Sequence, residues 1–322
     1  MARLAGRGAE TATPGDYTFA RLKTRFPLPA LALLAGASLW GVLWYPYRLL
    51  AQAGLDGVWA TLLTYAVALA LGTLLFPSHW HDLARAPGTC AAMAVAIGWS
   101  NLAWVIGMLE GEVMRVLLLF YLAPLWTVPL AHVLLDERLD RRGALVMAIA
   151  VAGAAVMLWH PEAGAPWPAA RAEWFGLAAG LFFAFGNVLV RKLSQVRDTS
   201  KSLAIWAGVV AAGLMGLPFT ANTAATAIAA ASASFGWIAA IGAALFGMSL
   251  ALQYGLSRVS ANRAIVILLF ELVIAAIAAY LLAGESLRPQ DWIGGALIAC
   301  ASLASGVISS REKQTIRGQS PD

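Results

Sequence analysis

Charged residues are scarce in this sequence. Only 12% of its 322 residues are Asp, Glu, Lys or Arg, whereas 60% are hydrophobic. Ordinary soluble domains carry about 25% charged residues. A soluble chain of this length could not bury so much apolar surface, because single hydrophobic cores stop growing near ~250–300 residues. The composition therefore excludes an ordinary soluble domain and indicates a chain that a bilayer solvates.

The residues of metal, redox and hydrolytic chemistry are also few. Two cysteines, Cys90 and Cys300, lie within apolar stretches, and their spacing fits no metal or redox motif. The four histidines are scattered, and the sequence contains no GxSxG, HExxH or P-loop motif. We therefore expect no enzyme activity, no cofactor, no metal site and no nucleotide-driven pumping by this chain.

Long apolar runs are what the sequence has instead. A membrane-spanning helix needs ~20 apolar residues. Ten stretches approach this length: 29–50, 58–77, 87–108, 114–135, 143–160, 173–191, 203–219, 234–256, 263–283 and 292–310. Residues 220–233 form a small, polar-flecked segment that is typical of a loop or an interfacial helix.

The basic residues predict how these spans are oriented. If the N-terminus is cytoplasmic, 18 Lys and Arg residues fall on the cytoplasmic side, and the outside has four: Arg48, Arg115, Arg171 and Arg288. Cytoplasmic loops carry such an excess of Lys and Arg. We therefore expect both termini in the cytoplasm and the chain in the cell (inner) membrane. The net charge of +5 is accounted for by topology, so we expect no nucleic-acid partner.

An internal repeat appears when the chain is compared with itself at an offset of 148 residues. Eight of the 38 pairs between 102–139 and 250–287 are identical. The informative ones are Gly107/Gly255, Arg115/Arg263 and Glu137/Glu285. Each half then has five spans, and because five is odd, the second half enters the membrane from the opposite face. Inverted repeats of this kind are common in secondary transporters.

The predicted fold class is therefore an all-α integral membrane protein with ten transmembrane helices, arranged as two inverted five-helix repeats. The predicted organisation is a cytoplasmic tail (1–28), a first repeat (29–160), an external linker (161–172), a second repeat (173–310) and a cytoplasmic tail (311–322).

Short motifs in both halves resemble the drug/metabolite transporter superfamily, specifically its EamA-type ten-helix branch. The first half has Trp40-Gly41, Tyr121-Leu122-Ala123-Pro124, Asp136-Glu137-Arg138-Leu139 and Gly143-Ala144; the second has Phe185-Gly186-Asn187, Phe270-Glu271-Leu272, Gly284-Glu285-Ser286-Leu287 and Gly294-Gly295-Ala296-Leu297-Ile298. The ninth helix of the family usually reads Leu-Glu-Pro, whereas Leu272 replaces that proline here, which removes the residue that would kink this helix. The resemblance implies transport, mostly export or facilitated movement of amino acids and similar metabolites.

Glu271 is the leading candidate for a functional residue, because it lies well inside an otherwise apolar span. A charge at the bilayer centre costs roughly 2.5–3.5 kcal/mol on insertion scales. Such a residue faces the bundle interior, pairs with a partner or stays protonated. Its role is either a contact with a substrate amine or a proton, or a structural hydrogen bond between two helices.

Further candidates are polar and aromatic side chains within the spans. Trp40 and Trp44 share one helical face, and Asn101 and Trp104 share another. The candidate substrate-binding residues are Glu271, Trp40, Trp44, Asn101, Trp104, Tyr121, Asn187, Gln253 and Tyr254. For each amide the alternative is an interhelical hydrogen bond, and for the aromatics it is packing. Pro124 and Pro129 each remove a backbone donor and predict a hinge or a static kink.

The sequence thus favours a secondary transporter that exports a small amino-acid-like or amphipathic solute by alternating access between inverted repeats. The alternatives are a channel or receptor without a transport cycle and, with less support, an intramembrane enzyme. The expected partners are the solute and membrane lipid. The sequence leaves the oligomeric state open and is compatible with a monomer.

Overall fold

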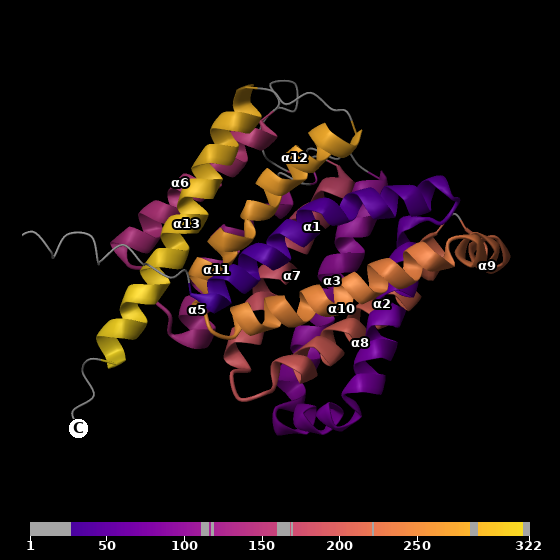
Figure 1. Ribbon diagram of the computed structural model, residues 1–322, viewed down its shortest axis with the longest axis horizontal. Coiled ribbons are helices and arrows are strands. Elements are labelled where there is room, and N and C mark those ends of the chain that lie inside the picture. Colours follow the sequence, from indigo (N-terminus) through magenta and orange to yellow (C-terminus); the bar gives the residue numbers. More distant parts are fainter. Residues whose placement is uncertain are drawn as a thin grey trace, which may run out of the picture.

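The computed structural model describes residues 27–110, 116, 119–159, 168, 170–220, 222–283 and 289–317, and every regular element in these ranges is helical. The first group of elements is α1 (Leu28–Gln52), α2 (Gly57–Leu75), η1 (Pro77–Arg85), α3 (Pro87–Glu110), α5 (Ala123–Leu135) and α6 (Arg141–Leu158). The second group is α7 (Arg171–Lys192), α8 (Asp198–Gly216), η3 (Leu217–Phe219), α9 (Ala224–Ala233), α10 (Phe235–Leu256), α11 (Ala261–Leu268), α12 (Phe270–Ala283) and α13 (Pro289–Arg317). Figure 1 shows them as one bundle, with α6 and α13 along one edge and α9 at the other.

Seven segments within the described ranges are long and apolar enough to cross a bilayer, counting α11 and α12 together as one. The helices α5 and α9 are shorter. In the segment 220–233, α9 begins at Thr223, whose hydroxyl accepts a hydrogen bond from the Thr226 amide (3.3 Å) and caps the helix. The predicted all-α membrane fold is confirmed.

The predicted fourth and ninth spans each contain a short turn that hydropathy did not predict. A turn at Tyr121 and Leu122 precedes α5, and Leu269 separates α11 from α12. Tyr121 and Leu269 are 148 residues apart, the offset of the internal repeat. The two halves are therefore interrupted at equivalent positions, and in the second half this happens without a proline.

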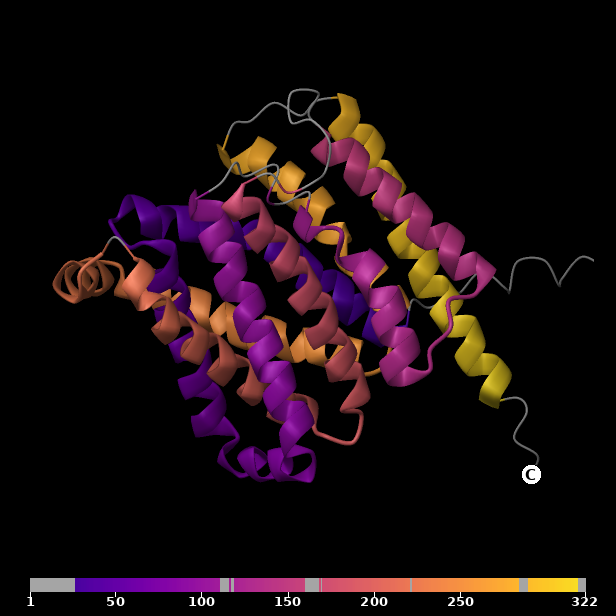
Figure 2. The same cartoon turned by 180° about the vertical axis from the view of Figure 1, so that it is seen from behind.

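The two halves repeat each other's packing with the partners exchanged. Helix α3 packs against α7 and α8, and its counterpart α10 packs against α1 and α2. Likewise α5 packs against α7, and α12 against α1. Figure 2 shows the same bundle from behind, with α3 and α7 side by side. The first helix of each half therefore lies against the other half.

Glycines from the internal repeat allow these close approaches. A Cβ atom on Gly107 in α3 would lie 3.1 Å from the carbonyl oxygen of Ala172 at the start of α7. A Cβ atom on Gly255 in α10 would lie 2.8 Å from the carbonyl oxygen of Pro29 at the start of α1. Each half therefore has a glycine whose helix lies close to the first helix of the other half, which explains why this glycine is repeated. In α7, a Cβ atom on Gly176 would lie 2.7 Å from the Val116 carbonyl oxygen, so this glycine also allows close helix packing.

Alternate loops gather at one end of the bundle, which we call the basic end: residues 77–86, 136–140, 193–197 and 257–260. Polar contacts join them, including those of Arg85 with the Gln195 carbonyl (3.5 Å) and of Arg191 with Glu137 (3.1 Å). The last turns of α13, in yellow, reach the same end in Figure 1. At the opposite end, the Asp56 amide donates to the side chain of Asn222 (2.9 Å). Consecutive loops must lie at alternate ends of the bundle in a chain of ten spans, and these loops do.

Several sequence expectations fall on residues outside the described ranges. They include Arg115, Glu285, most of the tail 1–28 and most of the linker 161–172. In the C-terminal tail, α13 continues to Arg317, beyond the predicted end of the tenth span.

Candidate functional site

The two interrupted spans meet through one hydrogen bond. The hydroxyl of Tyr121, at the turn before α5, donates to Oε1 of Glu271 at 3.1 Å. Glu271 is the second residue of α12, directly after the interruption at Leu269. The bond therefore links the first half of the chain to the second at the place where both helices are broken.

Helix α1 brings its own backbone against this site. A Cβ atom on Gly41 would lie 2.7 Å from the carbonyl oxygen of Glu271 and 3.0 Å from the amide nitrogen of Ala275. Gly41 is near the middle of α1 (Leu28–Gln52). Glu271 is therefore close to the centre of the bundle along its length, at the depth where a membrane makes a carboxylate most costly.

The geometry suits a group that changes partners. Glu271 is partly buried, Tyr121 is 9% exposed, and the hydroxyl–carboxylate bond joins halves that are inversely repeated. Leu122 and Leu269 keep right-handed helical backbone angles, so each interruption is a local turn. Interrupted helices in corresponding positions of two inverted halves mark the binding region of many transporters.

The two tryptophans of α1 flank the Gly41 contact. Trp40 is half-buried and packs against the main apolar core, whereas Trp44 makes an edge-on ring contact with Tyr45 at 5.7 Å. Both are thus on the helix that touches Glu271, one on each side of Gly41.

The predicted polar face of α3 lies elsewhere. The side-chain nitrogen of Asn101 donates to the Ile97 carbonyl of its own helix (3.1 Å). Asn101 borders a small gap together with Val58 of α2 and Val209 of α8. Trp104 is half-buried. The structure therefore places Asn101 against α2 and α8 and not at the interrupted helices.

Two other predicted amides lie toward the basic end. Asn187 is 8% exposed and Gln253 is 4% exposed. In the described part of the chain, neither Nδ2 of Asn187 nor Oε1 of Gln253 has a hydrogen-bond partner. Tyr254 also lies there, with the Arg258 guanidinium 4.0 Å from its ring centre. Its neighbour Gly255 packs at the start of α1, and Gly41 is twelve residues further along, roughly 18 Å at 1.5 Å per residue.

Pro124 is in the first turn of α5, directly after the interruption at Tyr121 and Leu122. It has no N–H group to donate, and its fixed φ angle suits the start of a helix. Pro129 is inside α5 and is exposed. The hinge or kink predicted for these prolines is therefore accompanied by an actual break beside Pro124.

Glu137 and Asn262 are two polar residues outside the set of candidate binding residues. Glu137 Oε1 accepts from Arg191 Nε (3.1 Å), and its Oε2 accepts from the Ala261 amide (2.8 Å), the first amide of α11, so Glu137 caps a helix. Asn262 is 5% exposed, and its Oδ1 has no partner among the described residues. The repeated Glu137 and the position of Asn262 at the start of a span were the available signals.

Other charges at the basic end form ion pairs. Asp82 in η1 accepts from Arg197 and from the Ser200 hydroxyl (3.0 Å), and it lies 3.3 Å from Arg85. The Arg197 hydrogen bond holds the pKa of the Asp82 carboxyl below its usual range, and that of Ser200 adds to the effect. These pairs fix η1, the connection between α2 and α3, to the start of α8.

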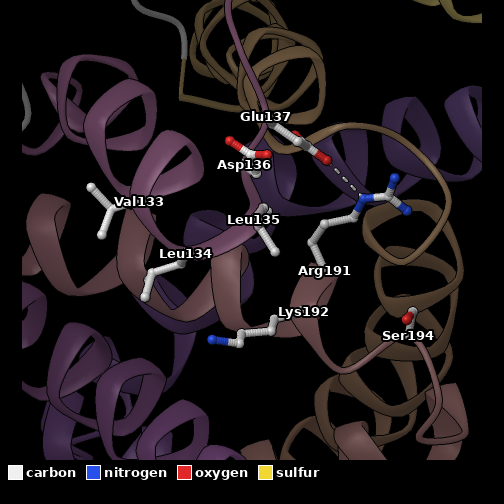
Figure 3. A pocket seen from close by; sticks show the side chains of 8 residues that line it. All are labelled: Val133, Leu134, Leu135, Asp136, Glu137, Arg191, Lys192 and Ser194. Atoms are coloured by element: carbon white, nitrogen blue, oxygen red, sulfur yellow. Dashed lines mark hydrogen bonds and ion pairs between the residues drawn. The ribbon is translucent and has the colours of Figure 1, made fainter.

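An open hollow of about 490 Å³ lies at the basic end between α5 and α7. Figure 3 shows Glu137 and Arg191 paired in its wall, with Lys192 reaching in from the end of α7. Its lining residues are Val133, Leu134, Leu135, Asp136, Glu137, Arg191, Lys192 and Ser194. Within the described residues, no group of three His, Cys, Asp or Glu side chains could hold a metal ion.

The fold and its membrane-length apolar helices define a multi-pass membrane protein. Comparison with known proteins places it within that class: the EamA-like transporter family matches residues 28–159 and again 170–306. The chain belongs to the EamA-like transporter family, a family of transporters and not of enzymes.

One relative agrees with this assignment, and one solved structure shares the fold. An uncharacterized transporter of Archaeoglobus fulgidus is 27% identical over 242 residues, which cover 74% of this chain and 82% of the relative. A solved crystal structure, described only as that of a protein, aligns with a TM-score of 0.66 at 16% identity and covers 88% of this chain and 98% of its own. The second likeness shows the fold alone.

Proposed function

We propose that this transporter exports a small amino-acid-like or amphipathic solute by alternating access, with the solute bound at the meeting point of the interrupted helices. The observation that carries the proposal is the hydrogen bond from Tyr121 to Glu271, because it joins the two inverted halves at the break in each. Rocking of one half against the other must change this contact, so a solute that engages Glu271 is coupled to the motion.

The chemistry of the site favours a solute with an amine group. Glu271 is an acceptor at the centre of the bundle, and one of its oxygens already accepts from Tyr121. An ammonium group offers the opposite charge and up to three donors, so it offsets the cost of a carboxylate at this depth. The half-buried Trp40 on the adjoining helix suits the apolar part of such a solute.

The proposed orientation puts the basic end, and with it both termini, in the cytoplasm of the cell. The loops 77–86, 136–140, 193–197 and 257–260 lie together at that end. Each carries one arginine, and further Lys and Arg residues lie at the adjoining helix ends, in agreement with the positive-inside rule: Arg141, Arg142, Arg191 and Lys192. The predicted division into repeats 29–160 and 173–310 belongs to the same proposal.

Transport is tested with purified protein in proteoliposomes and a panel of radiolabelled amino acids and amines. A carrier gives saturable uptake that is accelerated by unlabelled solute on the other side, whereas a channel or receptor gives no such counterflow. We expect counterflow for at least one amine-bearing solute. Flux of no member of the panel, or flux without counterflow, would refute alternating access.

Glu271→Gln tests the site within that assay. The glutamine keeps an oxygen that can accept from Tyr121, so folding persists, but the negative charge is lost. We expect flux to fall at least about tenfold, the equivalent of 1.4 kcal/mol. The matched control is Glu173→Gln, which neutralises a buried glutamate at the first turn of α7, on a different helix from Tyr121 and Glu271. Equal flux in the two variants would remove Glu271 from the site.

A further inference from the structure

Glu137 connects the two halves of the chain at the basic end. It follows α5 in the first half, and both of its partners, Arg191 and Ala261, belong to the second half. Arg191 also donates to the Ser257 carbonyl (2.7 Å). We call these four residues (Glu137, Arg191, Ser257 and Ala261) the Glu137 cluster. Figure 3 shows the pair of Glu137 and Arg191, with the side chain of Glu137 directed away from α5 toward α7.

The Glu137 carboxylate also caps a helix of the other half. Ala261 is the first residue of α11, and Ser260 before it makes no side-chain cap. The first amides of a helix have no partner within it and carry partial positive charge. Glu137 supplies the missing acceptor from across the boundary between the halves. Since α11 runs directly to the break at Leu269 and then to Glu271, the cap is attached to the helix that carries the candidate site.

Three buried amides lie within one helical turn of cluster residues along the chain. Asn187 precedes Arg191 by one turn of α7, Gln253 precedes Ser257 by one turn of α10, and Asn262 follows Ala261. Their exposed fractions are 8%, 4% and 5%. Each has a side-chain atom without a hydrogen-bond partner in the described part of the chain: Asn187 Nδ2, Gln253 Oε1 and Asn262 Oδ1.

Such orphaned polar atoms are rare in proteins and call for an explanation. Three of them lie on α7, α10 and α11, which contact one another, and they are explained if these amides meet water or solute in another conformation. On the outer side of the cluster, the hollow of about 490 Å³ is open, and Glu137 and Arg191 belong to its wall. Glu137 and Arg191 therefore line the open hollow, whereas the three amides are buried and are not part of its lining.

We propose that Glu137 is a positioning residue that closes the transport path at the basic end, and that Asn187, Gln253 and Asn262 line the closed part of that path. This inference rests on the proposed transport function. When the Glu137 cluster opens, α11 loses its cap and the two halves separate at this end, so that the amides are hydrated.

The test measures access to the three amides from each side of the membrane. In a background with Cys90→Ala and Cys300→Ala, Gln253→Cys is the reporter, and Asn262→Cys is a second reporter should the first fail to fold. The probe is a membrane-impermeant maleimide, applied to inside-out vesicles and to spheroplasts. Ser194→Cys, an exposed position in the hollow, identifies the preparation in which the basic end faces the probe.

Glu137→Gln is expected to raise the labelling rate of the reporter about five- to thirtyfold from the basic end, because it weakens a charge-assisted hydrogen bond between the halves. Labelling from the other side does not rise. Arg191→Gln gives the same direction of change, and the double variant gives no further increase, since both side chains belong to one interaction.

The matched control is Asp140→Asn. Asp140 lies at the same end and caps α6, accepting from the Gly143 amide (2.9 Å), but both residues lie within the first half. We expect it to leave the labelling rate unchanged. An equal rise in this control, a rise from both sides, or no rise in Glu137→Gln would each overturn the proposal. None of these results depends on solute flux, so this proposal and the transport function fail separately.

Discussion

The contact between α1 and α12 can be tested by adding one methyl group at Gly41. A Cβ atom there would lie 2.7 Å from the Glu271 carbonyl oxygen, 2.9 Å from Ile274 Cβ and 3.0 Å from the Ala275 nitrogen. Favourable contacts between carbon atoms lie at about 3.5–4.0 Å. Two of the three neighbours are backbone atoms, which no rotamer change can move, so Gly41→Ala must push the helices apart.

The expected cost of this overpacking is about 1–3 kcal/mol. Separation of the helices by about 0.5–1 Å also forfeits a quarter to a half of the dispersion energy of the contacts involved. Because the displaced backbone includes Glu271, we expect both a lower melting temperature and a lower flux. The two measurements are thermal unfolding in detergent and counterflow in proteoliposomes.

The matched control is Gly247→Ala in α10. Gly247 is exposed, and a Cβ atom there would meet nothing within 4 Å. Alanine favours a helix over glycine by up to about 1 kcal/mol, so this variant is expected to be neutral or slightly stabilising with normal flux. If Gly41→Ala unfolds and transports like Gly247→Ala, the close contact of α1 with Glu271 is refuted.

Two further predictions concern single polar groups. Tyr121→Phe removes the donor to Glu271 and is expected to cost about 1–3 kcal/mol and to lower flux; in a Glu271→Gln background the same change should have less effect on flux, and additive effects would argue against a shared role. Asp82→Asn removes the acceptor of Arg197 at the basic end. Because the folded-state pKa of Asp82 is lowered, its stabilisation is fully present above the unfolded value of about 3.9 and is lost as the pH falls through the folded value. The wild type should therefore melt at a higher temperature than Asp82→Asn at pH 7, and this difference should vanish in acid; a difference independent of pH would contradict the ion pair.

The helices were predictable from composition because a membrane span leaves a strong signal, about twenty apolar residues in a row. The predicted first span, 29–50, agrees closely with α1 (Leu28–Gln52), and the predicted eighth, 234–256, with α10 (Phe235–Leu256). The family resemblance was likewise confirmed by the match to both halves.

The interruptions of the fourth and ninth spans were not predictable by the same reasoning. The sequence stays apolar through Leu122 and through Leu269. Hydropathy therefore gives no sign of the turn at either residue. Pro124 was a local signal for the first break. The second break has no proline, and only the repeat offset from Tyr121 pointed to it.

The arrangement of the site residues depended on tertiary contacts that no single segment encodes. Glu271 stands out because a carboxylate is costly at that depth, but its partner Tyr121 lies 150 residues earlier. Helical periodicity predicted that Asn101 and Trp104 share one face of their helix. It could not predict which neighbouring helix packs against that face. The same reasoning could not separate Tyr254, which contacts Arg258, from residues closer to Glu271.

The exchange of first helices between the halves has a consequence for biosynthesis. The partners of α1 include α10, which begins at Phe235, whereas α1 itself ends at Gln52. At about 5–20 residues per second, the ribosome needs roughly 10–40 s to make the intervening chain. During that time α1 stays in lipid without the neighbours against which its Gly36 and Gly41 later pack. Lipid therefore solvates the apolar surface of α1 first, and this surface packs against other helices only afterwards. Assembly of this transporter is completed only when the second half has been inserted.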